Sequence, residues 1–155
     1  MRQVNALRPL RPMVEGMKSK LPRVTGGAED WRPLVLIIDD DTAVRDSLAA
    51  VMEAFGFRTR TAGNGFEGLE AIETETPSAI ITDLHMPEMD GFELLTALRC
   101  AKTSIPVVVI SGGMARGYDF LGAATRMGAV AAFQKPLPVF EMMDTITGLT
   151  ARQAA

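Results

Sequence analysis

Short apolar runs alternate with segments of helical periodicity along most of this chain, and that alternation limits the possible folds more than any other feature. The run Leu34–Ile38 is apolar at every position, which is typical of a strand buried on both faces. Helical segments follow each run, and apolar residues on their period, such as Phe66 and Phe140, are expected to face inward. The expected strands are 34–38, 57–61, 79–82, 107–110 and 130–134, and the expected helices begin near Thr42, Gly65, Gly91, Tyr118 and Phe140. Five such units predict a doubly wound α/β fold, (βα)5, with one parallel five-stranded sheet between two layers of helices.

The size and composition of the chain fit one domain. Its 155 residues are 47% hydrophobic, which is enough to build a core. The longest apolar runs have the length of strands and fall far short of the ~20 residues that a membrane span requires. Cys100 is the single cysteine, so we expect no intramolecular disulfide, a reducing cytoplasmic location, and a packing role near the end of a helix.

Charge and composition divide the chain into three parts. Residues 1–24 hold six basic residues and one acidic residue, with prolines and glycines but no sustained apolar period. We therefore expect a basic, flexible arm at 1–31, a domain at 32–150 and a short tail at 151–155. The residues beyond the arm are acidic overall, which argues against a nucleic-acid-binding surface.

Polar side chains follow four of the apolar runs at the points where the strands are expected to end. Asp39 and Asp40 follow the first strand, Asp83 the third, Ser111 the fourth and Lys135 the fifth. In a parallel sheet these ends meet at one edge, where ligands bind. Carboxylates crowded there repel one another, and oxygen ligands without a histidine or cysteine cluster favour Mg²⁺ as the neutralising ion.

The motifs around these residues resemble those of a known family. They are Val35–Asp41, Thr82–Gly91, Val109–Gly113 and Gln134–Leu137, and their order and spacing are similar to those in the receiver domains of bacterial two-component response regulators. The resemblance covers residues 34–150. It implies a flavodoxin-like receiver fold and a phosphoacceptor signalling protein, with no enzymatic activity beyond its own phosphorylation and dephosphorylation.

The resemblance also implies roles for individual residues. Asp83 would accept a phosphoryl group from a phosphohistidine. Asp40 would bind Mg²⁺ directly and Asp39 mainly through water, with Asp83 and the backbone carbonyl of His85 completing the metal site. Lys135 would pair with Asp83 before transfer and with a phosphoryl oxygen afterwards, and Ser111 would hydrogen-bond another phosphoryl oxygen.

The peptide bond between Lys135 and Pro136 is expected to be cis, as the resemblance implies.

Partners follow from the same resemblance. A histidine kinase or a histidine phosphotransfer protein would supply the phosphoryl group. Because the chain ends at Ala155, we expect a single-domain regulator whose output passes to a protein target, through the face formed by the fourth and fifth strands and helices, or to another phosphotransfer protein.

Two departures from the family pattern concern signal transmission and phosphoryl lifetime. Many receivers have an aromatic residue three positions before the lysine, but this chain has Ala132 there and Phe133 next to it. His85 and Gly113 occupy the two positions that, in the family, control access of water to the phosphoryl group. We therefore predict an altered lifetime of the phosphorylated state.

Some residues near the motifs have simpler structural interpretations. Asp41 is expected to cap the first helix rather than bind metal, and Gly56 to end that helix. Asp90 and Gly91 are expected to form a turn before the third helix, with Gly91 supplying a positive φ.

Two other functions remain open on the sequence. An aspartyl phosphatase of the haloacid-dehalogenase type would use Asp39 as nucleophile and Asp41 as acid/base, but Ala43 and the lack of an acidic pair after Lys135 count against it. A receiver-like scaffold that is never phosphorylated is the third interpretation.

Overall fold

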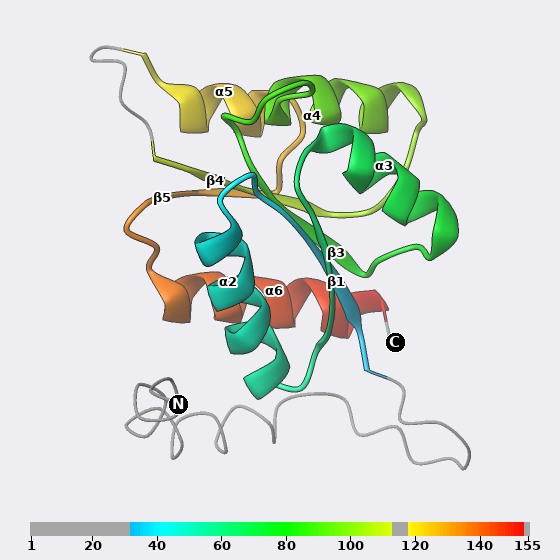
Figure 1. Cartoon of the computed structure of the whole chain (residues 1–155), viewed down its shortest axis with the longest axis vertical. Coiled ribbons are helices and arrows are strands. Elements are labelled where there is room, and N and C mark those ends of the chain that lie inside the picture. The colour runs from blue at the N-terminus through cyan, green and yellow to red at the C-terminus, as the bar shows by residue number, and fades with distance from the viewer. Residues whose placement is uncertain (1–31, 113–117, 154–155) are drawn as a thin grey trace.

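One parallel sheet organises the protein. The computed structural model describes residues 32–112 and 118–153, and in this part of the chain five strands pair in the order β2-β1-β3-β4-β5 (Figure 1). This confirms the predicted doubly wound fold. The strands are β1 (Leu34–Ile38), β2 (Arg58–Ala62), β3 (Ala79–Asp83), β4 (Val107–Ser111) and β5 (Ala131–Gln134), and the helices are α2 (Thr42–Ala54), α3 (Gly65–Thr74), α4 (Gly91–Cys100), α5 (Phe120–Arg126) and α6 (Val139–Gln153).

Helices cover both faces of the sheet and enclose a separate core on each. Helices α2 and α6 lie on one face, and α3, α4 and α5 lie on the other (Figure 1). Successive β1 residues point to opposite faces, so Val35 and Ile37 enter the first core while Leu36 and Ile38 enter the second. All residues of β1, β3 and β4 are buried, which explains the apolar runs that make up all of β1 and most of β3 and β4.

The strand bounds differ from the predicted ones by a residue at most, but one residue in each of two helices was wrongly expected to face inward. Phe66 is 55% exposed and Phe140 is 40% exposed. The buried positions of α3 are Gly65, Gly68 and Ala71, which leave Phe66 about 100° around the helix from Gly65. In α6 the inward row includes Val139 and Met143, so Phe140 is displaced in the same way.

Cys100 and α5 also depart from expectation. Cys100 is exposed and does not pack in the core, because the buried positions of α4 are Gly91, Leu94, Leu95 and Leu98. The helix expected near 118–127 spans only Phe120–Arg126. No helix in the described ranges combines the length and apolar character needed to cross a membrane.

Caps fix where the helices begin and end. As predicted, Asp41 caps α2, its carboxylate accepting hydrogen bonds from the backbone N–H groups of Ala43 at 2.9 Å and Val44 at 3.2 Å. Gly56 follows the end of α2 with φ 93°, which suits glycine. Asp90 caps α4 in a capping box with Glu93.

The turn before α4 was predicted with the wrong role for its glycine. Gly91 does not have a positive φ, whereas Glu88 does, at 69°. A Cβ on residue 91 would lie 2.5 Å from the Asp83 carbonyl oxygen and 2.8 Å from Leu84 Cα. Glycine is therefore required here because the start of α4 approaches the end of β3 closely.

This close approach predicts opposite effects for two glycine substitutions. Gly91→Ala should lower the free energy of unfolding by about 1–3 kcal/mol, because backbone atoms would have to move. Gly148→Ala lies in the interior of α6, where the added Cβ would meet no atom within 4 Å other than its chain neighbours and the backbone of its own helix, and it should raise the free energy of unfolding by about 0.5–1 kcal/mol. Urea denaturation measures both; destabilisation of similar size in the two variants would contradict the interpretation.

Candidate functional site

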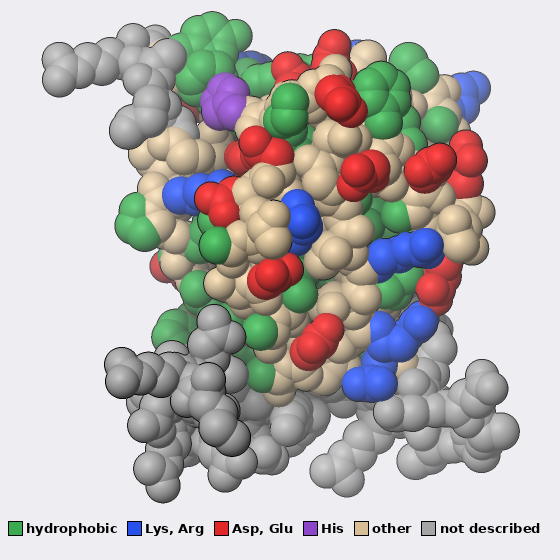
Figure 2. Space-filling model, viewed as in Figure 1, with side chains coloured by type: hydrophobic (Ala, Val, Ile, Leu, Met, Phe, Trp, Pro, Cys, Tyr) green, Lys and Arg blue, Asp and Glu red, His purple; other side chains and the backbone are tan. Residues whose placement is uncertain are grey.

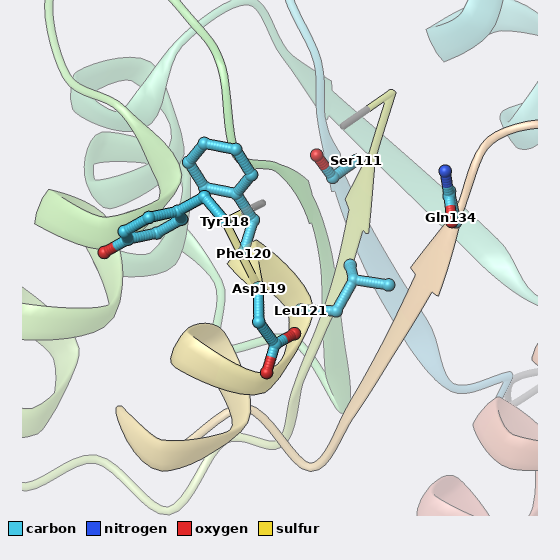
Figure 3. Close-up of a pocket in the computed structure, with 6 residues that line it drawn as sticks. All are labelled: Ser111, Tyr118, Asp119, Phe120, Leu121 and Gln134. Carbon is cyan, nitrogen blue, oxygen red and sulfur yellow. The ribbon is translucent and has the colours of Figure 1, made fainter. Parts of the chain in front are cut away.

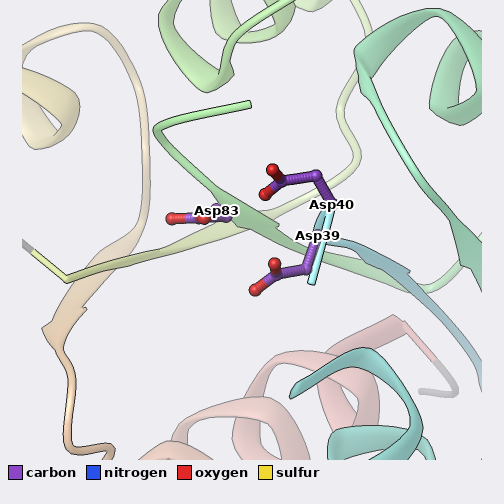
Figure 4. Close-up of side chains that lie close together, drawn as sticks. All are labelled: Asp39, Asp40 and Asp83. Carbon is purple, nitrogen blue, oxygen red and sulfur yellow. The ribbon is translucent and has the colours of Figure 1, made fainter. Parts of the chain in front are cut away.

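Three carboxylates meet at the carboxyl edge of the sheet. Asp39 and Asp40 directly follow β1, and Asp83 ends β3 (Figure 4). The parallel pairing of Ile38 with Thr82 brings these strand ends together. One oxygen from each carboxylate lies within 4.8 Å of the other two. The convergence expected from the sequence is therefore present for all three acids.

Lys135 is the cation of this cluster. Its Nζ lies 3.0 Å from Asp39 Oδ2 and 3.6 Å from Asp83 Oδ2. The ammonium thus forms the expected ion pair with Asp83 and also donates a hydrogen bond to Asp39, which the resemblance did not imply. The peptide bond between Lys135 and Pro136 is cis, as expected.

Burial and neighbouring charges shift the pKa of two of these groups. Burial and the nearby Asp39 charge raise the pKa of Asp83, and Lys135 and the backbone N–H groups of Leu84 and His85 oppose that rise. Burial alone would lower the pKa of Lys135, but Asp39 and Asp83 together raise it. The ammonium is therefore held in its charged form between two acids.

Ser111 lies beside this cluster at the end of β4. It is 1% exposed, and its backbone carbonyl accepts a hydrogen bond of 2.8 Å from the backbone N–H of Lys135. Ser111 also lines a pocket of about 150 Å³ with Gln134 and the residues at the start of α5 (Figure 3). Gly113, the second predicted access position, lies outside the described residues.

The loop between β3 and α4 is held from both ends. The backbone N–H of Leu84 donates to Asp83 Oδ1 at 2.8 Å. At the far end, Asn64 Nδ2 donates to Glu88 Oε2 at 3.0 Å, and the backbone N–H of Gly65 donates to the Met89 carbonyl at 3.2 Å. His85, between these anchors, has an exposed side chain, and Figure 2 shows the histidine on the surface with hydrophobic side chains nearby.

Arg45 is a site neighbour that the sequence analysis did not identify. Its Nη1 donates a 2.6 Å hydrogen bond to the Asp39 carbonyl oxygen. A cation in the first turns of a helix interacts unfavourably with the helix dipole. This position was the feature of the sequence that could have identified Arg45 as a residue with a partner near the site. Asn64 was missed as well, because only the folded chain brings it to Glu88.

The arrangement suits a hard divalent cation. Asp39, Asp40 and Asp83 offer oxygen donors only, and Mg²⁺ is bound by a small number of carboxylates together with water or phosphate oxygens. Asp41 does not belong to this donor set, since its carboxylate caps α2.

Comparisons with known proteins agree with this geometry. Residues 35–147 match the family described as the response regulator receiver domain. The transcriptional regulatory protein PrrA of Mycobacterium tuberculosis is 33% identical over 123 residues, which cover 79% of this chain and 52% of that protein. Sporulation initiation phosphotransferase F of Bacillus subtilis is 30% identical over 113 residues, covering 72% of this chain and 89% of that protein.

Solved structures show the same similarity. The receiver domain of the Francisella response regulator 1452 superposes with a TM-score of 0.72 at 28% identity, covering 79% of this chain and 99% of that chain. A CheY-like receiver domain protein from Methanospirillum hungatei gives a TM-score of 0.70 at 26% identity, covering 80% and 98%. The chain spans about half the length of PrrA, at 52%.

The raised pKa of Asp83 predicts a pH-dependent gain in stability for Asp83→Asn without divalent cations. The folded protein binds the Asp83 proton more tightly than the unfolded chain, so stability falls as pH rises from the ordinary pKa of 3.8 through the raised folded value. The variant should therefore be more stable than the wild type at pH 7, by on the order of 1 kcal/mol, and this gain should disappear below pH 3.8.

Urea denaturation across this pH range measures the effect. Asp46→Asn, which removes an exposed carboxylate of α2 outside the cluster, is the matched control. Added Mg²⁺ should reduce the gain, because the cation neutralises the repulsion. A stability difference that is the same at low and neutral pH would contradict the assignment.

Proposed function

The chain belongs to the family of response regulator receiver domains, and from this premise we propose that it is phosphorylated on Asp83 in two-component signalling. One observation carries the proposal. Asp83, 6% exposed, lies with Asp39 and Asp40 in one carboxylate cluster and 3.6 Å from Lys135 Nζ. The motif that contains Asp83 lies within the residues that match the family.

In the proposed reaction a carboxylate oxygen of Asp83 attacks the phosphorus of a phosphohistidine. The new O–P bond forms an acyl phosphate as the N–P bond breaks, and the imidazole leaves with the bonding electrons. Lys135, already between Asp39 and Asp83, turns to a phosphoryl oxygen, and the Ser111 hydroxyl donates to another.

Mg²⁺ is the proposed cofactor of this step. Asp39, Asp40, Asp83 and the backbone carbonyl of His85 would hold it. When bound, the ion would offset the negative charge on the carboxylates and the phosphoryl group. The fit rests on the all-oxygen donor set and on the burial of Asp39, which is 0% exposed.

The proposed partners follow from the family. The phosphoryl group would come from a histidine kinase or a histidine phosphotransfer protein, and residues 32–150 would act as the receiver in the cytoplasm. Similarity to a protein named sporulation initiation phosphotransferase F supports onward phosphotransfer as one output. The other is a protein target bound on the face of β4, α5, β5 and α6, with no role for nucleic acid or a membrane.

Incubation with acetyl phosphate and Mg²⁺ tests the proposal. The wild type should gain one phosphoryl group by intact mass, and peptide mapping should place it on Asp83. EDTA and Asp83→Asn should each abolish the gain, whereas Asp46→Asn should label normally. Label on Asp39 would instead indicate a phosphatase of the haloacid-dehalogenase type, and no label on any residue would indicate a binding scaffold.

The position of His85 predicts an altered phosphoryl lifetime. Its side chain is exposed two residues after Asp83, where water approaches the acyl phosphate. His85→Asn should change the dephosphorylation rate by about threefold or more, since a barrier change of under 1 kcal/mol suffices for this. Loss of label over time measures the rate, with Glu70→Gln on α3 as an exposed control. Equal rates in wild type and His85→Asn would refute the role.

A further inference from the structure

The fifth strand does not supply an aromatic ring to the face of the sheet on which α5 lies. Ala132 packs in the core that contains Phe120 and Met127. The neighbouring Phe133 packs in the other core, against the face covered by α2 and α6. Because adjacent strand residues point to opposite faces, Phe133 cannot replace the ring that is missing at 132.

Phe120 supplies a ring to this face from a different element. It is the first residue of α5, and its centroid lies 5.0 Å from that of His85 with the ring planes at 89°. The centroid of the Phe120 ring also lies 4.5 Å from that of Tyr118 and 6.4 Å from that of Phe92. Figure 3 shows the rings of Tyr118 and Phe120 beside the pocket that Ser111 lines. Phe120 is therefore the centre of an aromatic cluster next to the candidate site.

His85 connects this cluster to the phosphoacceptor. Its backbone N–H faces the Asp83 carboxylate and lowers the pKa of that group, as does the N–H of Leu84, which donates to Asp83 Oδ1 at 2.8 Å. Its imidazole meets the ring of Phe120 in the T-shaped geometry that aromatic pairs favour. One residue thus contacts Asp83 through its backbone and α5 through its side chain.

Helix α5 is short and buries few of its residues completely. It has seven residues, and Ala124 is the one that is fully buried. Asp119 caps it by accepting a 2.8 Å hydrogen bond from the backbone N–H of Gly122. A short helix with little buried surface moves readily, so the packing of Phe120 has a large share in fixing where α5 begins.

We propose that Phe120 is a positioning residue of the phosphorylation site: its ring holds the His85 imidazole, and through this contact the state of Asp83 is coupled to the start of α5. The inference rests on the proposed phosphorylation of Asp83. A phosphoryl group on Asp83 replaces the carboxylate that the backbone N–H groups of Leu84 and His85 face with an acyl phosphate. The His85 ring then shifts, and the rings of Phe120 and Tyr118 move with it. Conversely, the Phe120 ring sets the His85 orientation that controls dephosphorylation.

A double-mutant cycle on the dephosphorylation rate tests the positioning role. Phe120→Leu should change the rate by about 2- to 10-fold, which is the rate equivalent of one aromatic pair. In a His85→Ala background the same substitution should change it by less than about 1.5-fold. Phe120→Tyr should retain the wild-type rate, because it keeps the ring. Phe66→Leu, which removes an exposed ring of α3 outside the aromatic cluster, is the matched control and should leave the rate unchanged.

Additive effects of Phe120→Leu and His85→Ala would overturn the proposal, as would an unchanged rate in Phe120→Leu. Thermal unfolding confirms that each variant is folded before its rate is used.

The single tyrosine of the chain provides a second readout. Incorporation of 3-fluorotyrosine gives one ¹⁹F resonance, from Tyr118. It should shift when acetyl phosphate and Mg²⁺ are added to the wild type, but not in Asp83→Asn. In Phe120→Leu the shift should be lost although intact mass still shows a phosphoryl group.

The two readouts separate the inference from the proposed function. A wild type that gains no label on Asp83 overturns both. A labelled wild type whose Tyr118 resonance stays in place, or moves equally in Phe120→Leu, overturns the coupling and leaves the phosphoacceptor role intact.

Discussion

The structure around the site depends on the repulsion among carboxylates gathered at one edge of a parallel sheet. Asp39 and Asp83 are 0% and 6% exposed, so water does little to screen them. Lys135 is shared between them at 3.0 Å and 3.6 Å, and burial together with the Asp39 charge still raises the pKa of Asp83. The fold tolerates this arrangement because the buried side chains on both faces of the sheet hold the strands in place.

The fold and the acidic cluster were predictable because both depend on short sequence patterns. The buried strand Leu34–Ile38 and the residues that follow it needed only periodicity and the geometry of parallel sheets. What was missed depended on contacts between distant segments. The need for Gly91 comes from the approach of Asp83 and Leu84, and Lys135 contacts Asp39 as well as the expected Asp83. No local pattern contains that information.

Two aromatic residues on the helices were misplaced for a different reason. Phe66 and Phe140 fit a helical period, but glycine and valine one position earlier lie on the inward row. A hydrophobic pattern favours the larger side chain, while the buried row of α3 requires small residues: a Cβ on Gly68 would lie 2.4 Å from Ile38 Cδ1. The role of Phe120 could not be predicted from the sequence either, because its ring partner His85 is distant in the sequence.

Competition for Lys135 gives the site a way to rearrange that needs no aromatic residue on β5. The ammonium carries one positive charge and already contacts two carboxylates. A phosphoryl group on Asp83 would add negative charge on one side of it, so the hydrogen bond to Asp39 would weaken in favour of a phosphoryl oxygen. The backbone of Lys135 is bonded to Ser111 at 2.8 Å. A shift of the lysine side chain would therefore take place next to the end of β4, where Ser111 and the start of α5 line the same pocket.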